Sequence, residues 1–218
     1  MRIPDFAAAR AKGTLRLAPC DPSILVRLTR RPGSEPYYGK RKTSRFDDPL
    51  QQYGVTYAAF SLEVAFAETV LHEHGLYQDG AWIVPGSMIS ERSVVRLDAP
   101  RVLQLADLTG PALKALGLDN QISAGADYAF TWDLSRALHD AVPECDGILY
   151  VSRQHNKGEA VALFERCGAT IHPPGTMALE QHQDLATVLQ LFGVEVLPEG
   201  EPPAPAPPPD RPRLKRIR

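Results

Sequence analysis

The sequence has few cysteines, little net charge and no long apolar segment. Its three cysteines, Cys20, Cys145 and Cys167, are widely separated and form no CxxC pair, which favours reduced, structural thiols in a cytoplasmic protein. The formal net charge of −2 gives no electrostatic reason to expect direct binding of nucleic acid. No apolar run approaches about 18 residues, and residues 1–19 lack the apolar core of a signal peptide, so we expect a soluble protein with no membrane partner.

The chain is long and apolar enough to form one globular domain. Of its 218 residues, 44% are hydrophobic and 23% are charged. We expect a helical or irregular lead-in over residues 1–20 and a single domain over residues 21–197. The elements predicted for this domain are strands over 23–28 and 54–60, a helix from the N-cap Ser61 to His74, strands over 82–99 and 101–108, helices within 111–142, a strand over 146–154, a strand or short helix over 159–166, and a helix and strand over 184–198. Many short strands with a few helices between them indicate the α+β class.

Residues 198–218 differ in composition from the rest of the chain. They contain eight prolines and no core-forming pattern, which predicts a disordered, polyproline-rich tail. Five of the last eight residues are basic. We interpret this tail as a solvated chain end in preference to a contact with nucleic acid or a partner.

Five polar residues stand out against the apolar segments around them. Arg27 interrupts a strand, Arg45 precedes an aromatic residue, Tyr57 lies on a strand, Glu68 falls among the apolar positions of a helix, and Ser152 ends a strand. Taken singly, each has an ordinary structural explanation as an edge, loop or surface residue. Because burying an unpaired carboxylate is expensive, Glu68 is exposed, paired or functional, and Arg45 is a candidate partner.

Two other arrangements could carry chemistry but are disfavoured. Glu68, His72 and His74 place a carboxylate and an imidazole at i and i+4, but there is no HExxH pattern and no evident third ligand, so we expect no metal site. Cys145 with His139 suggests a thiol nucleophile, but no activating context can be read from the sequence.

Taken together, these motifs resemble one protein family. LVRL near the start, SRFDDP followed by YGVTYAAFSLEVAFAE, and DGILYVSRQ with a later LFE are similar to RES-domain proteins, the toxins of bacterial toxin–antitoxin pairs. The resemblance covers roughly residues 20–175 and keeps the order of the motifs. One position departs from the family pattern, because Asp47 stands where the family usually has asparagine. We expect its extra negative charge to alter the contact with a substrate phosphate.

The resemblance implies an ADP-ribosyltransferase-like α+β fold, a mixed sheet with flanking helices, that consumes NAD⁺. Glu68 would stabilise the oxocarbenium-like charge that develops when the nicotinamide–ribose bond breaks. Arg27 and Arg45 would bind the pyrophosphate, Tyr57 would stack on nicotinamide, and Ser152 would position either the ribose or Glu68. On this view the catalytic residues are Glu68, Arg45 and Ser152.

The same resemblance implies the substrates and partners. Because no GxGxxG motif opens a helix, NAD⁺ is expected as a substrate and not as a bound cofactor. The acceptor of ADP-ribose is inorganic phosphate or water, or alternatively a protein side chain, and a non-catalytic binding module is a further alternative. The expected partner is a cognate antitoxin with a helix-turn-helix DNA-binding domain. A homo-oligomer is also left open.

Overall fold

A mixed eight-stranded sheet forms the centre of the computed structural model, which describes residues 1–72 and 75–198. Its strand order is β1-β7-β8-β9-β3-β2-β6-β10, and its neighbours are antiparallel except for the parallel pair β7 and β8. The strands are β1 (Leu17–Cys20), β2 (Val26–Thr29), β3 (Val55–Ala59), β6 (Ser93–Asp98), β7 (Leu103–Leu108), β8 (Gly147–Val151), β9 (Glu159–Phe164) and β10 (Thr170–Ala178).

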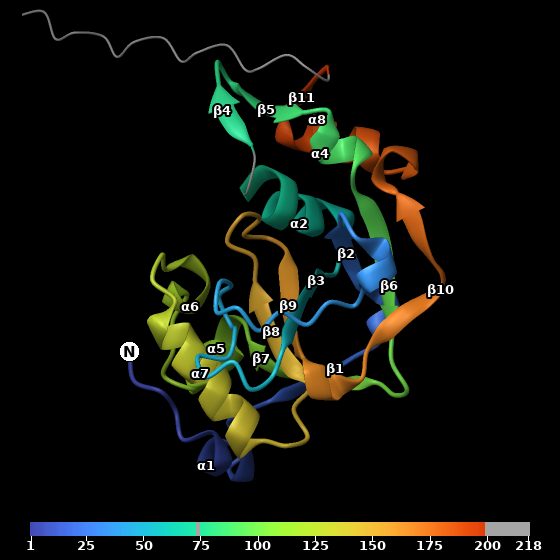
Figure 1. Cartoon of the computed structure of the whole chain (residues 1–218). Coiled ribbons are helices and arrows are strands. Elements are labelled where there is room, and N and C mark those ends of the chain that lie inside the picture. Colours follow the sequence, from blue (N-terminus) through green and yellow to red (C-terminus); the bar gives the residue numbers. More distant parts are fainter. Residues whose placement is uncertain (73–74, 199–218) are drawn as a thin grey trace, which may run out of the picture.

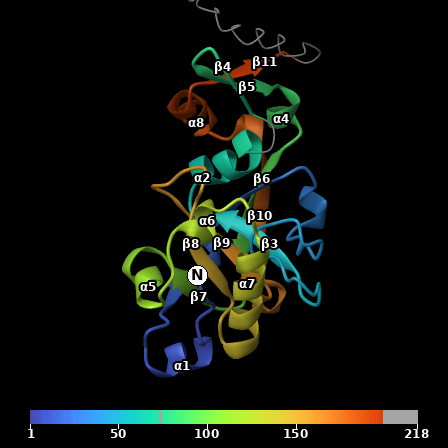
Figure 2. The ribbon, with the colours of Figure 1, turned by 90° about the vertical axis from the view of Figure 1, so that its left-hand side faces the viewer.

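A smaller three-stranded sheet, in the order β11-β5-β4, lies beyond one end of the large sheet, at the top of Figure 1. Its strands are β4 (Leu76–Gln78), β5 (Ala81–Pro85) and β11 (Val194–Leu197). The short helix α4 (Ser87–Ser90) and helix α8 (Leu185–Phe192) belong to the same region. Figures 1 and 2 both show helix α2 (Leu62–Phe66) between the two sheets.

Four further helices pack beside the large sheet: α1 (Phe6–Ala11), α5 (Gly110–Ala115), α6 (Gln121–Ala124) and α7 (Ala129–Ala141). Short 3₁₀ turns connect the other elements at Pro22–Ile24, Pro32–Ser34, Glu165–Cys167 and Leu179–Gln181. Among the described residues, no helix is both long and apolar enough to cross a bilayer.

The central strand β8 is buried on both faces. Ile148 and Tyr150 belong to a core shared with the helices, whereas Leu149 belongs to a second core on the opposite face. Such a strand is continuously apolar because neither face meets water. A Cβ atom on Gly147 would lie 2.4 Å from the carbonyl oxygen of Ala162, so only glycine permits this close approach of β9.

The helix predicted to begin at Ser61 begins there, because the Ser61 side chain accepts a hydrogen bond from the backbone N–H of Val64. Its α-helical part ends at Phe66, and the chain continues as a π-helical turn over Ala67–Leu71. A π turn is typically found at functional sites. The predicted end of this helix at His74 lies outside the described residues.

Two edge strands correct the sequence-based prediction. Residues 1–20 were expected to be helical or irregular, but they contain β1, which pairs with β7, as well as α1. Strand β10 was also missed and forms the other edge of the sheet. The segment 159–166, predicted as strand or helix, is strand β9 followed by a 3₁₀ turn. Apart from Pro198, the predicted tail over 198–218 lies outside the described residues.

Candidate functional site

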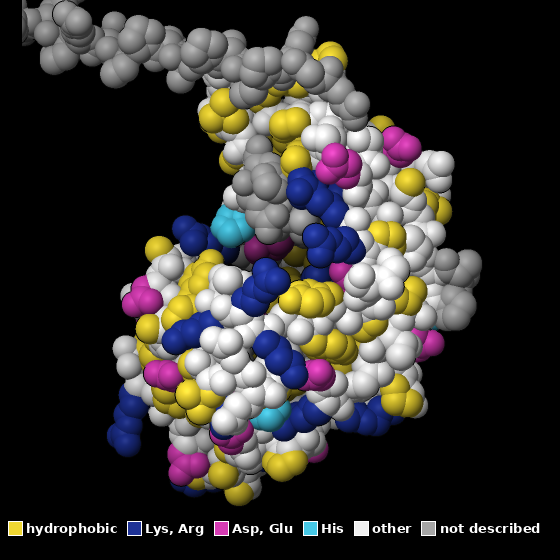
Figure 3. Space-filling view, in the orientation of Figure 1, with side chains coloured by type: hydrophobic (Ala, Val, Ile, Leu, Met, Phe, Trp, Pro, Cys, Tyr) yellow, Lys and Arg dark blue, Asp and Glu magenta, His cyan; other side chains and the backbone are white. Residues whose placement is uncertain are grey.

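A cavity of about 760 Å³ opens beside α2, between the ends of β2 and β3 and the segment that joins these strands. Figure 3 shows this hollow with Lys and Arg side chains gathered around it. The charged residues that line it are Arg27, Arg30, Arg31, Arg41, Arg45, Arg92 and Arg153, with Glu35, Asp47 and Glu68. Because seven arginines face three carboxylates, the cavity suits an anionic ligand.

Glu68 is held in one orientation by the loop that follows β8. Its Oε1 accepts a 2.6 Å hydrogen bond from Ser152 Oγ and a 3.1 Å bond from the backbone N–H of Arg153. No hydrogen bond from the described part of the chain reaches its Oε2. Since Glu68 lines the cavity, this second oxygen is available to a ligand.

Ser152 lies behind Glu68 and is not among the residues that line the cavity. It is 2% exposed, and its Oγ accepts hydrogen bonds from the backbone N–H groups of Gln154 and His155 at 3.2 and 3.0 Å. These two donors leave the hydroxyl proton of Ser152 for Glu68. Of the two placements that the sequence left open, beside the ribose or beside Glu68, the structure has the second.

Arg45 is almost completely buried at the wall of the cavity. Its Nη1 donates hydrogen bonds to the carbonyl oxygens of Gly125 at 2.8 Å and Ile122 at 3.3 Å. Its guanidinium also lies 4.6 Å from the centre of the Tyr128 ring, a cation–π contact. Burial lowers the pKa of Arg45, although an arginine remains charged in proteins. The α6–α7 region therefore fixes one end of this side chain.

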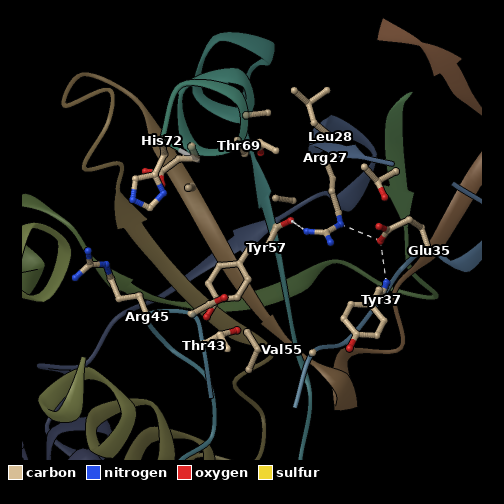
Figure 4. Close-up of a pocket in the computed structure, with 18 of the residues that line it drawn as sticks. Arg27, Leu28, Glu35, Tyr37, Thr43, Arg45, Val55, Tyr57, Thr69 and His72 are labelled. Carbon is tan, nitrogen blue, oxygen red and sulfur yellow. Dashed lines mark hydrogen bonds and ion pairs between the residues drawn. The ribbon is translucent and has the colours of Figure 1, made fainter. Parts of the chain in front are cut away.

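Arg27 lies across the cavity from Arg45, as Figure 4 shows. Its Nε donates to Glu35 Oε2 at 2.8 Å, and its Nη1 donates to the carbonyl oxygen of Tyr57 at 2.9 Å. The Glu35 side chain is 3% exposed, so this ion pair is largely shielded from water. Glu35 was not predicted from the sequence, because a carboxylate in a polar loop carries no local signal of its partner.

Tyr57 and Asp47 form one hydrogen-bonded unit. The Tyr57 hydroxyl donates to Asp47 Oδ1 and accepts from the backbone N–H of Phe46, both at 2.9 Å. The other oxygen of Asp47 accepts from the backbone N–H groups of Thr43 and Ser44 at 2.9 and 2.8 Å. Burial raises the pKa of Tyr57 well above its ordinary value, and Asp47 raises it further, so this hydroxyl remains a neutral donor.

Asp47 was expected to alter the contact with a substrate phosphate, and in the structure its carboxylate is bound by groups of the protein itself. Three donors already bind its carboxylate oxygens, and the residue is 2% exposed. An asparagine would offer one acceptor oxygen in place of two, and its NH₂ group would face an N–H or O–H donor. The ring of Tyr57 lines the cavity, while its hydroxyl is engaged with Asp47.

The structure does not favour a thiol nucleophile at Cys145. Its Sγ donates to the carbonyl oxygen of Gly147 at 3.1 Å, and burial raises the pKa of the thiol to about 11. The His139 ring stacks on Tyr53, with centroids 3.7 Å apart, and its Nδ1 lies 3.1 Å from Asp140. An activated cysteine needs the opposite, a lowered pKa beside a base.

The cavity brings together four of the predicted residues, Arg27, Arg45, Tyr57 and Glu68. Further lining residues were not predicted as part of the site, among them Tyr128, Tyr150, Arg153 and Gln154. Arg153 and Gln154 directly follow Ser152 in the DGILYVSRQ motif, so this motif was the sequence signal from which they could have been predicted. His72 also lines the cavity, but His74, the third residue of the disfavoured metal arrangement, lies outside the described residues.

Comparison with known proteins agrees with this geometry. The structure is similar to a chain in the crystal structure of the M. tuberculosis MbcT–MbcA toxin–antitoxin complex, with a TM-score of 0.57, 15% sequence identity, and coverage of 88% of this chain and 99% of that chain. This likeness confirms the predicted α+β, ADP-ribosyltransferase-like fold. No curated protein sequence matches this chain. The model of the RES domain matches residues 24–187, and the chain therefore belongs to the RES-domain family.

Proposed function

We propose that this protein is an NAD⁺-consuming toxin that cleaves the nicotinamide–ribose bond of NAD⁺. The observation that carries the proposal is Glu68, a carboxylate whose Oε1 is held by Ser152 and Arg153 while its Oε2 is open to an arginine-lined cavity. A carboxylate oriented before the substrate arrives needs no reorganisation as charge develops, which is where electrostatic catalysis gains most.

The chemistry follows from the charge that forms on the ribose. When the bond between C1′ and the nicotinamide nitrogen breaks, nicotinamide leaves neutral with the electron pair, and C1′ becomes oxocarbenium-like. The negative charge of Glu68 beside C1′ stabilises this cation and can accept a hydrogen bond from a ribose hydroxyl. An oxygen of inorganic phosphate or of water then bonds to C1′ in place of nicotinamide. The product is ADP-ribose-1″-phosphate when phosphate is the acceptor, and ADP-ribose and a proton when water is the acceptor.

The arginines of the cavity suit the rest of the substrate. Arg27 and Arg45 each use Nη1, and Arg27 also its Nε, to bind protein acceptors. Their Nη2 groups donate no hydrogen bond to the described residues and can therefore donate to the pyrophosphate oxygens. Guanidinium groups suit phosphate because they are planar and always charged. A cavity of about 760 Å³ also lies within the range of roughly 300–1,000 Å³ typical of small-molecule sites.

A cognate antitoxin is the proposed protein partner. Membership of the RES-domain family and the fold shared with a chain of a toxin–antitoxin complex support this. A helix-turn-helix DNA-binding domain in that antitoxin and a cytoplasmic location of the pair are parts of the same proposal. Expression of the toxin without its antitoxin should stop growth and lower cellular NAD⁺, and co-expression of the antitoxin should restore both.

The direct test is incubation of the purified protein with NAD⁺, with and without inorganic phosphate. Release of free nicotinamide, followed by chromatography, supports the proposal, and phosphate-dependent ADP-ribose-1″-phosphate identifies phosphorolysis. Labelling of a protein by ADP-ribose in a cell extract would favour transfer to a side chain as the main reaction. No turnover of NAD⁺ under any of these conditions, in the absence of antitoxin, would contradict every enzymatic assignment and favour a binding module.

A further inference from the structure

The cavity has two chemically different ends. Arg45 and His72 line one end, and His72 follows Glu68, which also lines the cavity, by one helical turn. The segment of residues 30–42 lines the other end. Figure 4 shows Arg45 and His72 on one side, Tyr37 on the opposite side, and Tyr57 between them. Cleavage at Glu68 uses only the nicotinamide riboside half of NAD⁺, so the cavity extends beyond what that half requires.

Tyr37 presents a half-exposed aromatic ring to the cavity. The residue is 50% exposed and lines the cavity, and neither its ring nor its hydroxyl makes a ring contact or a hydrogen bond with the described residues. The next residue, Tyr38, has the opposite environment, because its hydroxyl lies 3.3 Å from Cys167 Sγ in the second core. The exposed part of a tyrosine ring inside a cavity is a surface on which a planar base can stack.

The backbone on both sides of Tyr37 is held in place. The backbone N–H of Tyr37 donates to Glu35 Oε2 at 2.8 Å, and the same oxygen accepts from Arg27 Nε. Two residues later, Gly39 exchanges two 3.0 Å backbone hydrogen bonds with Val55 of β3. The ring is therefore presented by an ordered segment, which reduces the entropy lost when a ligand stacks on it.

The charge at this end also suits a nucleotide. Arg31 and Arg41 are exposed and line the cavity, and their side chains have no partner among the described residues. Arg27 lines the same cavity and is bonded to Glu35 of this segment. A base-stacking ring next to free guanidinium groups is the combination that binds a nucleoside phosphate.

We propose that residues 30–42 form the adenosine subsite of this cavity, with the adenine ring stacked on Tyr37 and the phosphates between Tyr37 and Arg27. The proposal rests on the proposed function for the identity of the dinucleotide. Binding of an adenine nucleotide at Tyr37 can nevertheless be measured without any turnover, so the two proposals can fail separately.

The binding test is calorimetric titration of ADP, which contains the adenosine diphosphate part of NAD⁺ and lacks nicotinamide, into the full-length protein. Tyr37→Ala should weaken ADP binding about tenfold, the lower part of the range for loss of one stacked base. Tyr37→Phe, which keeps the ring, should bind like the wild type. Tyr77→Ala is the matched control, because Tyr77 is 62% exposed and lies on β4 outside the cavity.

The kinetic test compares NAD⁺ with nicotinamide mononucleotide, which lacks the adenosine half. Tyr37→Ala should raise KM for NAD⁺ about tenfold and leave the kinetics of nicotinamide mononucleotide unchanged. No ADP binding by the wild type, or equal ADP affinity in wild type and Tyr37→Ala, would overturn the subsite. ADP binding that depends on Tyr37 in a protein with no NAD⁺ turnover would support the subsite and contradict the proposed function.

Discussion

Glu68 is the residue on which the proposed chemistry depends most directly. Glu68→Gln keeps the size of the side chain and an oxygen that can accept from Ser152, but it removes the negative charge. Loss of one such stabilising group typically costs about 10²–10³-fold in kcat, so NAD⁺ turnover should fall by that order. Nicotinamide release measured at saturating NAD⁺ checks this.

Glu63→Gln provides the control for that substitution. Glu63 lies in the first turn of the same helix, outside the cavity, and its carboxylate pKa is lowered by a hydrogen bond from Ser61. This variant should retain wild-type kcat. A Glu68→Gln protein that turns over NAD⁺ at the wild-type rate would show that the charge of Glu68 has no part in the reaction.

Asp47 and Tyr57 should be energetically coupled, because one hydrogen bond of 2.9 Å joins their side chains. Asp47→Asn should lower the free energy of unfolding by about 1–3 kcal/mol, since it leaves a buried donor without its acceptor. Tyr57→Phe removes the shared bond from the other side, so the double variant should lose less than the sum of the single losses. Denaturant unfolding of the four proteins measures the coupling, and strict additivity would contradict it.

At the scale of elements, the loop that carries Ser152 is packed tightly under α2. A Cβ atom on Gly158 would lie 2.2 Å from Val64 Cγ2, and Gly158 also accepts the backbone hydrogen bond of Ser152. Gly158→Ala should therefore cost about 1–3 kcal/mol of stability through overpacking. It should also reduce NAD⁺ turnover, because the displaced loop no longer holds Glu68.

A second substitution should relieve the contact between the new Cβ atom and Val64. Val64→Ala removes the methyl groups that the new Cβ would meet, so adding it to Gly158→Ala should recover stability and turnover relative to Gly158→Ala alone. Thermal unfolding and nicotinamide release of both single variants and the double variant provide the comparison. A double variant less active and less stable than Gly158→Ala would show that the contact with Val64 is not the cause of the destabilisation.

Two of the strands that were not predicted, β1 and β10, share one feature. β1 contains Pro19, and the β10 segment reads TIHPPGTMA, with a register shift between Ile171 and Thr176. Proline and glycine are ordinarily read as loop signals, but edge strands tolerate proline because one side of the strand needs no ladder hydrogen bonds. Both strands lie at the edges of the large sheet, a position that only the assembled sheet defines.

The start of the helix containing Glu68 was predicted correctly, but its change from an α-helix to a π turn was not. The cap at Ser61 is a local hydrogen bond to the backbone three positions later, so the residue type at the cap suffices to recognise it. The π turn over Ala67–Leu71 adds no such local signal. It allows Ala67 and Val70 to be buried while Glu68 remains open to the cavity, and this depends on packing against the sheet.

At the scale of the whole molecule, stability should depend on pH through Asp48. This residue is 1% exposed and joins the segment before β3 to α7 through Arg136, at 3.1 Å. Burial alone would raise the pKa of Asp48, but hydrogen bonds from Gln52, Leu50 and Arg136 lower it below its ordinary value. Its stabilising contribution is therefore present above the unfolded pKa of about 3.9 and is lost as the pH falls through the lower folded value.

Asp48→Asn should thus be less stable than the wild type at pH 7, and the difference should narrow below about pH 4. Urea unfolding at a series of pH values measures this. Asp133→Asn is the control, because Asp133 is exposed on α7 and has no interaction among the described residues, so its difference from wild type should stay small and constant. A difference for Asp48→Asn that does not change with pH would contradict the assigned role.

The sequence by itself was enough to recognise the family and to single out Arg27, Arg45, Tyr57 and Glu68, which line the cavity, because the motifs that contain them are short and continuous in the chain. Tertiary structure decided how each side chain is used. Ser152 and Glu68 are 84 positions apart in the chain, so their hydrogen bond exists only when β8 and α2 are packed together. The same holds for the pairing of Arg27 with Glu35 and for the half-exposed ring of Tyr37, because burial and exposure are properties of the assembled fold.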